Sequence, residues 1–211
     1  MRITEPVTLV TDYVMGAIAL VLAVRLFGDA GAGSHAAGRL WAGALAMTAA
    51  ASFIGGTYHG FVERMSGRAG RVTWMLAQLA AGLASACLLA AAVLAVSAGA
   101  LRIVLLAVAG IKLLLFARAA SRSDEFLPAI VDYGTALLAI LLAAWFIRPS
   151  GLTPAAGWIT AGVALSAMAG LIQWARIAPH RHFNHNDLFH VVQSVALYLL
   201  YRGGLLVSDM G

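Results

Sequence analysis

Four ionisable side chains lie in or at the ends of different apolar segments of the sequence: Asp12, His59, Asp132 and His190. An ionisable group in the hydrocarbon of a membrane costs several kcal/mol by insertion scales, so such groups are rare there. Those that do occur mark sites of binding, transport or chemistry. The transmembrane segments described below place all four groups at the same membrane face. The sequence therefore predicts one polar site at that face.

The first apolar segment carries two acids, Glu5 and Asp12, which are seven residues apart and share a helix face. Glu5 lies beside Pro6 at the expected start of the helix, where an acid stabilises the free N–H groups and the helix dipole. Asp12 lies roughly 8 Å inside the segment by helical rise, which is too deep for that role. We therefore expect Asp12 to be functional.

His59 ends the second apolar segment, in the run G-G-T-Y-H-G-F. The preceding Gly55 and Gly56 carry no side chains, so a neighbouring helix or a ligand can approach closely there. The alternative is a histidine that is only hydrogen-bonded at an interface between helices. A second histidine cluster on the same side favours the functional interpretation.

That second cluster lies in residues 180–194, H-R-H-F-N-H-N-D-L-F-H-V-V-Q-S. On a helix, Asp187 and His190 are three residues apart and can face one point. His185 and His190 are five residues apart and diverge, unless His185 precedes the helix.

The start of this cluster is expected to form a loop. Asn184 or Asn186 is the expected cap of the helix that follows, because an amide oxygen can accept hydrogen bonds from its first N–H groups. His180 and His182 flank an arginine in the loop and are expected to be solvated.

Asp132 has a structural alternative to a role in the site. It lies near the start of its apolar segment, where it can stabilise the amino end of a helix or pair with Lys112 or Arg118.

The composition is that of an integral membrane protein. Of the 211 residues, 62% are hydrophobic and 11% are charged, with a mean hydropathy of +0.88, whereas soluble domains are about half apolar. The first apolar segment carries acids where a cleavable signal needs a basic region and an uninterrupted apolar core. We therefore expect that segment to stay in the mature protein.

The single cysteine and the placement of the basic residues exclude two kinds of site and one kind of partner. The single Cys87 excludes an intrachain disulfide and a cysteine-rich metal site. The net charge of +5 comes from basic residues scattered at the ends of the apolar segments rather than gathered on one soluble face. That distribution excludes nucleic acid as a partner.

One crossing of the membrane needs about 20 apolar residues, and seven segments of the sequence meet this requirement. They are residues 7–27, 38–61, 72–97, 101–119, 127–147, 156–177 and 188–207. The connections are short and rich in helix-breaking residues, which leaves no room for a second domain. The sequence predicts an all-α fold, a bundle of seven transmembrane helices that forms a single domain over residues 1–211.

The distribution of basic residues predicts the orientation of the bundle. With seven spans, the amino terminus shares one side of the membrane with three of the loops. That side carries eight arginines: Arg2, Arg64, Arg68, Arg71, Arg118, Arg122, Arg176 and Arg181. The opposite side carries five: Arg25, Arg39, Arg102, Arg148 and Arg202. The positive-inside rule then places the amino terminus in the cytoplasm, with the inner (cytoplasmic) membrane of a bacterium as the expected location.

A weak internal repeat relates the first three spans to the last three. T-D-Y at residues 11–13 opens the first span and V-D-Y at 131–133 opens the fifth. The second span begins A-A-G-R-L-W-A-G and the sixth begins A-A-G-W-I-T-A-G. This pattern indicates a 3+1+3 arrangement of two parallel repeats joined by one helix. The alternative is chance similarity between alanine-rich helices.

The histidines at the end of the second span and the start of the seventh resemble those of the CREST superfamily, which includes alkaline ceramidases, progestin and adiponectin receptors (PAQR) and hemolysin III-like proteins. The seven-span topology covers the whole chain, whereas the motifs cover two short stretches. The family's Ser-x-x-x-His becomes Gly55-x-x-x-His59, and its His-x-x-x-His becomes Asn186-x-x-x-His190. The family's aspartate near the start of the third span has no counterpart. The runs H-N-D-L-F-H, T-E-P and T-D-Y also resemble an uncharacterised bacterial membrane family, which implies no function.

The CREST resemblance implies a zinc site. His59 and His190 would be ligands, and the third ligand would be His185, Asp187 or Asp12. Zinc with three protein ligands keeps one position open, lowers the pKa of a bound water to about 7 and polarises a carbonyl oxygen. Asp12 or Asp187 would then take the proton of that water, provided it is not itself a ligand. The implied function is hydrolysis of a membrane lipid amide or ester, as in ceramidases, at the cytoplasmic face.

Two other functions compete with the hydrolase. A non-catalytic membrane protein that transports a small solute with protons, or that binds a lipid, is consistent with the acids and the repeat. A haem b protein would use His59 and His190 as axial ligands. Elemental analysis and an absorption spectrum separate these functions. One zinc per chain favours the hydrolase, haem absorption favours the haem protein, and neither result favours transport or lipid binding.

Overall fold

The computed structural model describes residues 3–29, 36–146 and 154–208 and confirms the all-α fold. Along this part of the chain, seven α-helices and one short 3-10 helix follow one another: α1 (Pro6–Asp29), α2 (Ala36–Phe61), η1 (Val62–Arg64), α3 (Gly67–Val96), α4 (Gly99–Ala120), α5 (Leu127–Phe146), α6 (Pro154–Trp174) and α7 (His185–Ser208). Arg2, Arg148 and Ile147, the last residue of the predicted fifth span, lie outside the described residues.

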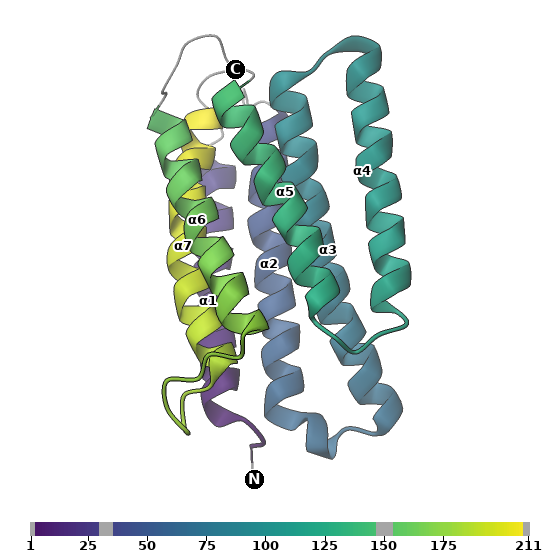
Figure 1. The fold of residues 1–211 in the computed structure, drawn as a ribbon, viewed down its shortest axis with the longest axis vertical. Coiled ribbons are helices and arrows are strands. Elements are labelled where there is room, and N and C mark those ends of the chain that lie inside the picture. Colours follow the sequence, from purple (N-terminus) through teal and green to yellow (C-terminus); the bar gives the residue numbers. More distant parts are fainter. Residues whose placement is uncertain (1–2, 30–35, 147–153, 209–211) are drawn as a thin grey trace.

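Six of the described helices, α1 to α6, are long and apolar enough to cross a membrane, which identifies an integral membrane protein. Helix α7 has the same length as α1, 24 residues, but does not meet this requirement for apolar composition. It nevertheless packs along α1 and α6 within the bundle (Figure 1). The predicted seven helices are therefore confirmed, with six of them candidate membrane spans by composition.

Six of the helices form a closed ring in the order α1, α2, α3, α5, α6, α7 and back to α1. Helix α4 lies outside this ring and packs mainly against α3 and α5 (Figure 1). Two three-helix units, α1 to α3 and α5 to α7, related by rotation about an axis along the membrane normal, would have these neighbours. The arrangement of helices is thus the one that a 3+1+3 repeat predicts, while the repeat in the sequence stays a prediction.

Glycines allow close approaches between neighbouring helices of the ring. A Cβ atom at Gly162 of α6 would lie 2.7 Å from Cγ of Leu200 in α7. A Cβ atom at Gly56 of α2 would lie 2.7 Å from Cδ1 of Tyr13 in α1. Any side chain at these two positions would push the helices apart, so the packing depends on glycine.

The apolar core fills the half of the bundle that is farther from the amino terminus. Its members include Leu26, Leu45, Ile140, Leu197 and Leu200, each at most 3% exposed. Many of the buried polar side chains lie in the other half of the bundle. These include Asp12, Gln78, Asp187, His190 and Gln193. The half that contains the amino terminus is therefore where a polar site can form.

Candidate functional site

A buried contact between α1 and α7 joins Asp12 to His190. Asp12 Oδ1 lies 3.1 Å from His190 Nε2, and the two side chains are 4% and 7% exposed. The other ring nitrogen, Nδ1, lies 3.0 Å from Oγ1 of Thr11. Both ring nitrogens of His190 therefore have partners on α1. Sequence reasoning does not identify Thr11, since a threonine in an apolar helix gives no signal apart from its position beside Asp12.

The hydrogen bonds of Thr11 indicate how this cluster is protonated. Its hydroxyl donates to the carbonyl oxygen of Thr8 at 3.1 Å, so its oxygen accepts the Nδ1 proton of His190. The contact between Nε2 and Asp12 Oδ1 then needs one further proton, because one of the two atoms must donate. The Asp12–His190 pair thus shares that proton. It consists of a carboxylic acid and a neutral imidazole, or of a carboxylate and an imidazolium.

His59 pairs with Glu5 at the start of α1. His59 Nδ1 lies 3.4 Å from Glu5 Oε2, and the backbone N–H of Glu5 donates to the carbonyl oxygen of His59 at 3.2 Å. The N–H of Thr4 donates to the carbonyl oxygen of Gly60 at 3.0 Å, so the residues before α1 are held against the end of α2. The His59 ring lowers the pKa of the Glu5 carboxyl below its ordinary value, and partial burial opposes this shift.

Asn184 caps α7 and is thus the correct one of the two predicted caps. Its Oδ1 accepts the N–H groups of Asn186 at 2.8 Å and Asp187 at 3.2 Å. In return, Asp187 Oδ2 accepts the N–H of Asn184 at 2.7 Å, so the two residues form a capping box. This reciprocal pair explains why a carboxylate is buried at Asp187. The predicted catalytic role of Asp187 stays a prediction with a structural alternative.

A cavity of about 590 Å³ lies between the helices in the half of the bundle that carries these groups. Asp12, His59 and His190 all line it. The three predicted side chains thus line one cavity, while their convergence on one ligand and their roles stay predictions. The rest of the wall is mostly apolar and comes from six helices, α1, α2, α3, α5, α6 and α7, and from Phe126 just before α5.

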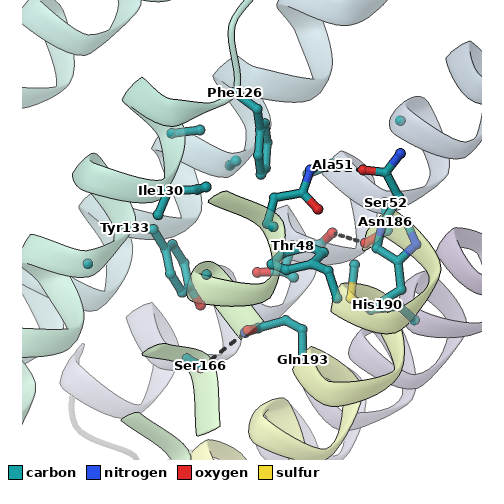
Figure 2. Close-up of a pocket in the computed structure, with 18 of the residues that line it drawn as sticks. Thr48, Ala51, Ser52, Phe126, Ile130, Tyr133, Ser166, Asn186, His190 and Gln193 are labelled. Atoms are coloured by element: carbon teal, nitrogen blue, oxygen red, sulfur yellow. Dashed lines mark hydrogen bonds between the residues drawn. The ribbon is translucent and has the colours of Figure 1, made fainter. Parts of the chain in front are cut away.

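Aromatic rings form one part of the cavity wall. Trp74 of α3, Phe126 before α5 and Phe189 of α7 all line the cavity. The ring centroids of Trp74 and Phe126 are 5.8 Å apart, and those of Phe126 and Phe189 are 6.2 Å apart. Figure 2 shows Phe126 and Tyr133 on the opposite side of the cavity from His190. The cavity therefore has polar groups on one side and aromatic rings on the other.

Two glutamines add polar groups to the wall. Gln173 Nε2 donates to Asn186 Oδ1 at 2.8 Å, which joins α6 to the start of α7. Gln193 Nε2 donates to Ser166 Oγ at 3.2 Å between the same two helices (Figure 2). Each of the two amides thus donates one hydrogen bond to a side chain of the neighbouring helix.

The cavity opens between α5 and α6. Leu138 of α5 and both Leu171 and Trp174 of α6 line the cavity, yet they are 53%, 54% and 64% exposed. Both helices are candidate membrane spans, so the opening faces lipid. A molecule dissolved in the bilayer can therefore enter the cavity sideways.

The other histidines of the second cluster lie outside the cavity wall. His185 is the first residue of α7 and is not among the described residues that line the cavity. His180 and His182 are exposed between α6 and α7, as predicted. There the N–H of His182 donates to Nδ1 of His180 at 3.2 Å.

The side chains at the cavity do not fit a zinc ion in this arrangement. Residues 3–29, 36–146 and 154–208 contain no group of three or more His, Cys, Asp or Glu side chains that could hold a metal ion, whereas a catalytic zinc has three protein ligands. Each ring nitrogen of His190 is already hydrogen-bonded, so neither is free to bind zinc or a haem iron. Zinc ligation by His59, His190 and His185 stays a prediction that these contacts do not support.

Asp132 belongs to a separate polar cluster. Lys112 Nζ of α4 lies 2.6 Å from Asp132 Oδ1 and 2.9 Å from Ser85 Oγ of α3. The Ser85 hydroxyl also donates to the carbonyl oxygen of Asp132 at 3.1 Å. Asp132 does not line the cavity, because its side of α5 faces α3 and α4. The prediction of one site for all four ionisable groups is therefore corrected, since three groups line the cavity and Asp132 pairs with Lys112.

Comparison with known proteins gives a family and no activity. Residues 7–209 match the family described as "Family of unknown function (DUF6962)". No curated protein and no solved structure matches the chain. These comparisons show no link to the CREST superfamily. The function must therefore be inferred from the geometry of the cavity and its polar groups.

Proposed function

We propose that this chain, which belongs to the family of unknown function DUF6962, is a membrane protein that binds an amphiphilic molecule of the lipid bilayer. The observation that carries the proposal is the mostly apolar cavity of about 590 Å³, with the buried Asp12–His190 pair in its wall. The apolar part of the molecule would lie between α5 and α6. Its polar group would reach the pair on α1 and α7.

The cavity has the size and chemistry of a ligand site. Sites for small molecules measure about 300–1,000 Å³ and combine apolar walls with a few placed polar groups. Here the polar groups lie at the end of the bundle near the amino terminus, and the apolar wall extends to an opening toward lipid. An amphiphile has this same division into a polar and an apolar part.

The opposite half of the bundle favours binding over transport. A transporter would need a second opening toward the other membrane face. In the described residues, the path to that face is filled by the apolar core around Leu26, Ile140 and Leu200. These side chains are at most 2% exposed. A solute that crossed this half of the bundle would have to displace its tightly packed apolar side chains.

A ceramidase-like zinc hydrolase is the second candidate, because Asp12, His59 and His190 line one cavity. That function requires His190 to release Asp12 and Thr11, and His59 to release Glu5, before either ring binds a metal. Amphiphile binding requires neither change. The described geometry therefore supports amphiphile binding more directly.

The arginine distribution supports a cytoplasmic amino terminus in a bacterial inner membrane. In that orientation, the Asp12–His190 pair lies toward the cytoplasmic leaflet. The proposed ligand would accordingly enter from that leaflet.

Quenching of tryptophan fluorescence tests the proposal. Bromododecanol combines an apolar chain with a bromine atom that quenches nearby indole rings, and Trp74 and Trp174 line the cavity. We expect saturable quenching of the purified protein in lipid nanodiscs, above the linear quenching of rings that face lipid. Elemental analysis of the same sample tests the hydrolase, because one zinc per chain would favour that candidate.

A pair of variants on α6 provides the control. Both Ala167 and Ala164 are exposed. Ala167 lines the cavity, whereas Ala164 does not. Ala167→Phe should remove the saturable quenching by filling the cavity, and Ala164→Phe should retain it. Saturable quenching that survives Ala167→Phe would show that bromododecanol binds elsewhere and would contradict the proposal.

A further inference from the structure

The buried oxygens around the cavity lack hydrogen-bond donors. Among the described residues, five buried side-chain oxygens have no hydrogen-bond partner: Glu5 Oε2, Asp12 Oδ2, Gln78 Oε1, Gln173 Oε1 and Asp187 Oδ1. Of these, Glu5 Oε2 still has its ion-pair contact with His59. Asp12 and Gln173 line the cavity. Buried polar atoms are normally paired, so the unpaired oxygens in the cavity wall are positions where a bound ligand can supply the donors.

The wall of the cavity carries no strongly basic side chain, neither lysine nor arginine, among the described residues. Gln173 and Gln193 donate to Asn186 and Ser166, and the ring nitrogens of His190 face Thr11 and Asp12. An anionic group would therefore meet no lysine or arginine in this wall and would lie beside the Asp12 carboxyl, which is unfavourable away from water.

The free oxygen of Asp12 is accessible because of Gly55. A Cβ atom at Gly55 would lie 3.7 Å from Asp12 Oδ2, and both residues line the cavity. The absence of that side chain leaves space beside a carboxyl group that is 4% exposed. A ligand atom can thus reach Oδ2 while Oδ1 keeps its contact with His190.

The aromatic wall also favours a cation. Trp74, Phe126 and Phe189 line the same cavity as Asp12. The faces of aromatic rings attract ammonium groups, most strongly where water is excluded. A cationic amphiphile in this cavity would therefore meet aromatic rings as well as the Asp12 carboxyl.

We propose that the amphiphile bound in this cavity is a cationic amine whose ammonium group donates a hydrogen bond to Asp12 Oδ2. The inference rests on the proposed function, because it names the ligand class for the same cavity. An ammonium group has three donors and no acceptor, which is the complement of a wall with free acceptors. Its apolar chain would lie toward Leu138 and Leu171 at the opening.

Three probes with the same chain length test the amine. They are bromododecylamine, bromododecanol and bromododecanoate, used in nanodiscs of zwitterionic lipid with empty nanodiscs as a measure of partitioning. We expect the amine to bind about ten-fold more tightly than the alcohol, the size of one charge-assisted hydrogen bond. The carboxylate should bind most weakly. Asp12→Leu, which removes the acceptor oxygen at the Oδ2 position, should remove the difference between amine and alcohol.

Two glycine variants of α2 keep the test independent of changes at Asp12. Gly55→Ala places a methyl group beside Asp12 Oδ2, whereas Gly43→Ala meets Cys87 Sγ at the same distance, 3.7 Å, away from the cavity. Both contacts are ordinary van der Waals distances, so both variants should fold. Gly55→Ala should weaken amine binding and Gly43→Ala should retain the wild-type affinity.

The outcomes separate the ligand class from the proposed function. If the wild-type protein binds amine and alcohol equally, or binds the carboxylate most tightly, the amine is wrong and binding in the cavity stands. If no probe gives saturable quenching, the proposed function itself is wrong. An unchanged preference for the amine in Gly55→Ala would place the ammonium group away from Asp12 and overturn the inference.

Discussion

Asp12 and His190 each supply the partner that burial of the other requires. The pair shares one proton in either of its two forms, so it brings no net charge into the bundle. This removes much of the cost of placing two ionisable groups inside a membrane protein. Thr11 holds the second ring nitrogen and thereby fixes the orientation of the His190 ring. The three side chains thus form one prearranged unit in the cavity wall.

At Glu5, the structure predicts a loss of stability in acid. The pKa of this carboxyl is lower than its ordinary 4.5, with His59 as the main cause. A carboxyl with a lower pKa in the folded chain stabilises it above the unfolded pKa, and this contribution disappears as the pH falls through the folded pKa. The unfolding temperature of the wild type relative to Glu5→Gln should therefore fall between about pH 5 and pH 3.

The expected effect at Glu5 is small. The side chain of Glu5 is 38% exposed, so the contribution is a fraction of one kcal/mol after solvent screening, on the order of a surface ion pair. Glu63→Gln, at an exposed acid of η1, is the matched control and should follow the wild type. A difference between wild type and Glu5→Gln that stays constant over this pH range would contradict the role of the His59 contact.

Helix α4 depends on one polar cluster for its attachment to the ring. The described part of α4 buries only Ala109, Phe116 and Ala120, and most of its surface faces outward. The Lys112 ammonium group joins it to Asp132 of α5 and Ser85 of α3. Because α4 has so little apolar packing, this cluster contributes a larger part of the free energy that holds α4 against the ring. An ion pair between two helices of the ring would contribute a smaller part.

Breaking the Lys112–Asp132 pair should destabilise the protein strongly. Lys112→Met leaves a carboxylate that is 7% exposed without its charge partner, which costs about 3 kcal/mol for a buried pair. The double variant Lys112→Met with Asp132→Leu removes both charges and should recover most of that loss. Unfolding in mixed micelles measures the coupling, with Arg118→Met on the same helix as the control. Additive effects of the two substitutions would show that the pair is not coupled.

The extents of the helices could be predicted from apolar composition only where the helices cross hydrocarbon. The third predicted span begins at 72, whereas α3 begins at Gly67, because Ser66 accepts the N–H of Ala69 as a cap. The seventh predicted span begins at 188, whereas α7 begins at His185 after the cap of Asn184. Caps extend these helices into polar segments, where hydropathy gives no signal.

The depth of the site in the membrane could be predicted from the sequence. Which side chains face one another across neighbouring helices could not. Asp12 and Asp132 open their helices at similar depth, yet Asp12 meets His190 and Asp132 meets Lys112. The helices are apolar nearly all round, so no polar stripe indicates which face points inward. That rotation is set by tertiary packing, which also brings Thr11 to His190.

At the scale of the whole molecule, the orientation in the membrane can be tested by labelling from outside the cell. We expect a cysteine at Arg68, an exposed residue in the first turn of α3, to resist an impermeant maleimide in intact cells, because the arginine distribution predicts that this end of α3 is cytoplasmic. A cysteine at the exposed Ala98, between α3 and α4, should be labelled. Both substitutions are made in a chain with Cys87→Ser. Labelling at Arg68→Cys and protection at Ala98→Cys would invert the orientation.

The composition of α7 has a consequence for biosynthesis. Helices α1 to α6 have the length and apolar composition of membrane spans and α7 does not, so we expect α7 to enter lipid less readily by itself. When α7 emerges from the ribosome, its partners α1 and α6 have already entered the bilayer, and they offer Asp12 and Ser166 to its polar side chains His190 and Gln193. Insertion of α7 is therefore coupled to its docking. The same hydrogen bonds that complete the cavity wall decide whether the nascent chain acquires its final topology.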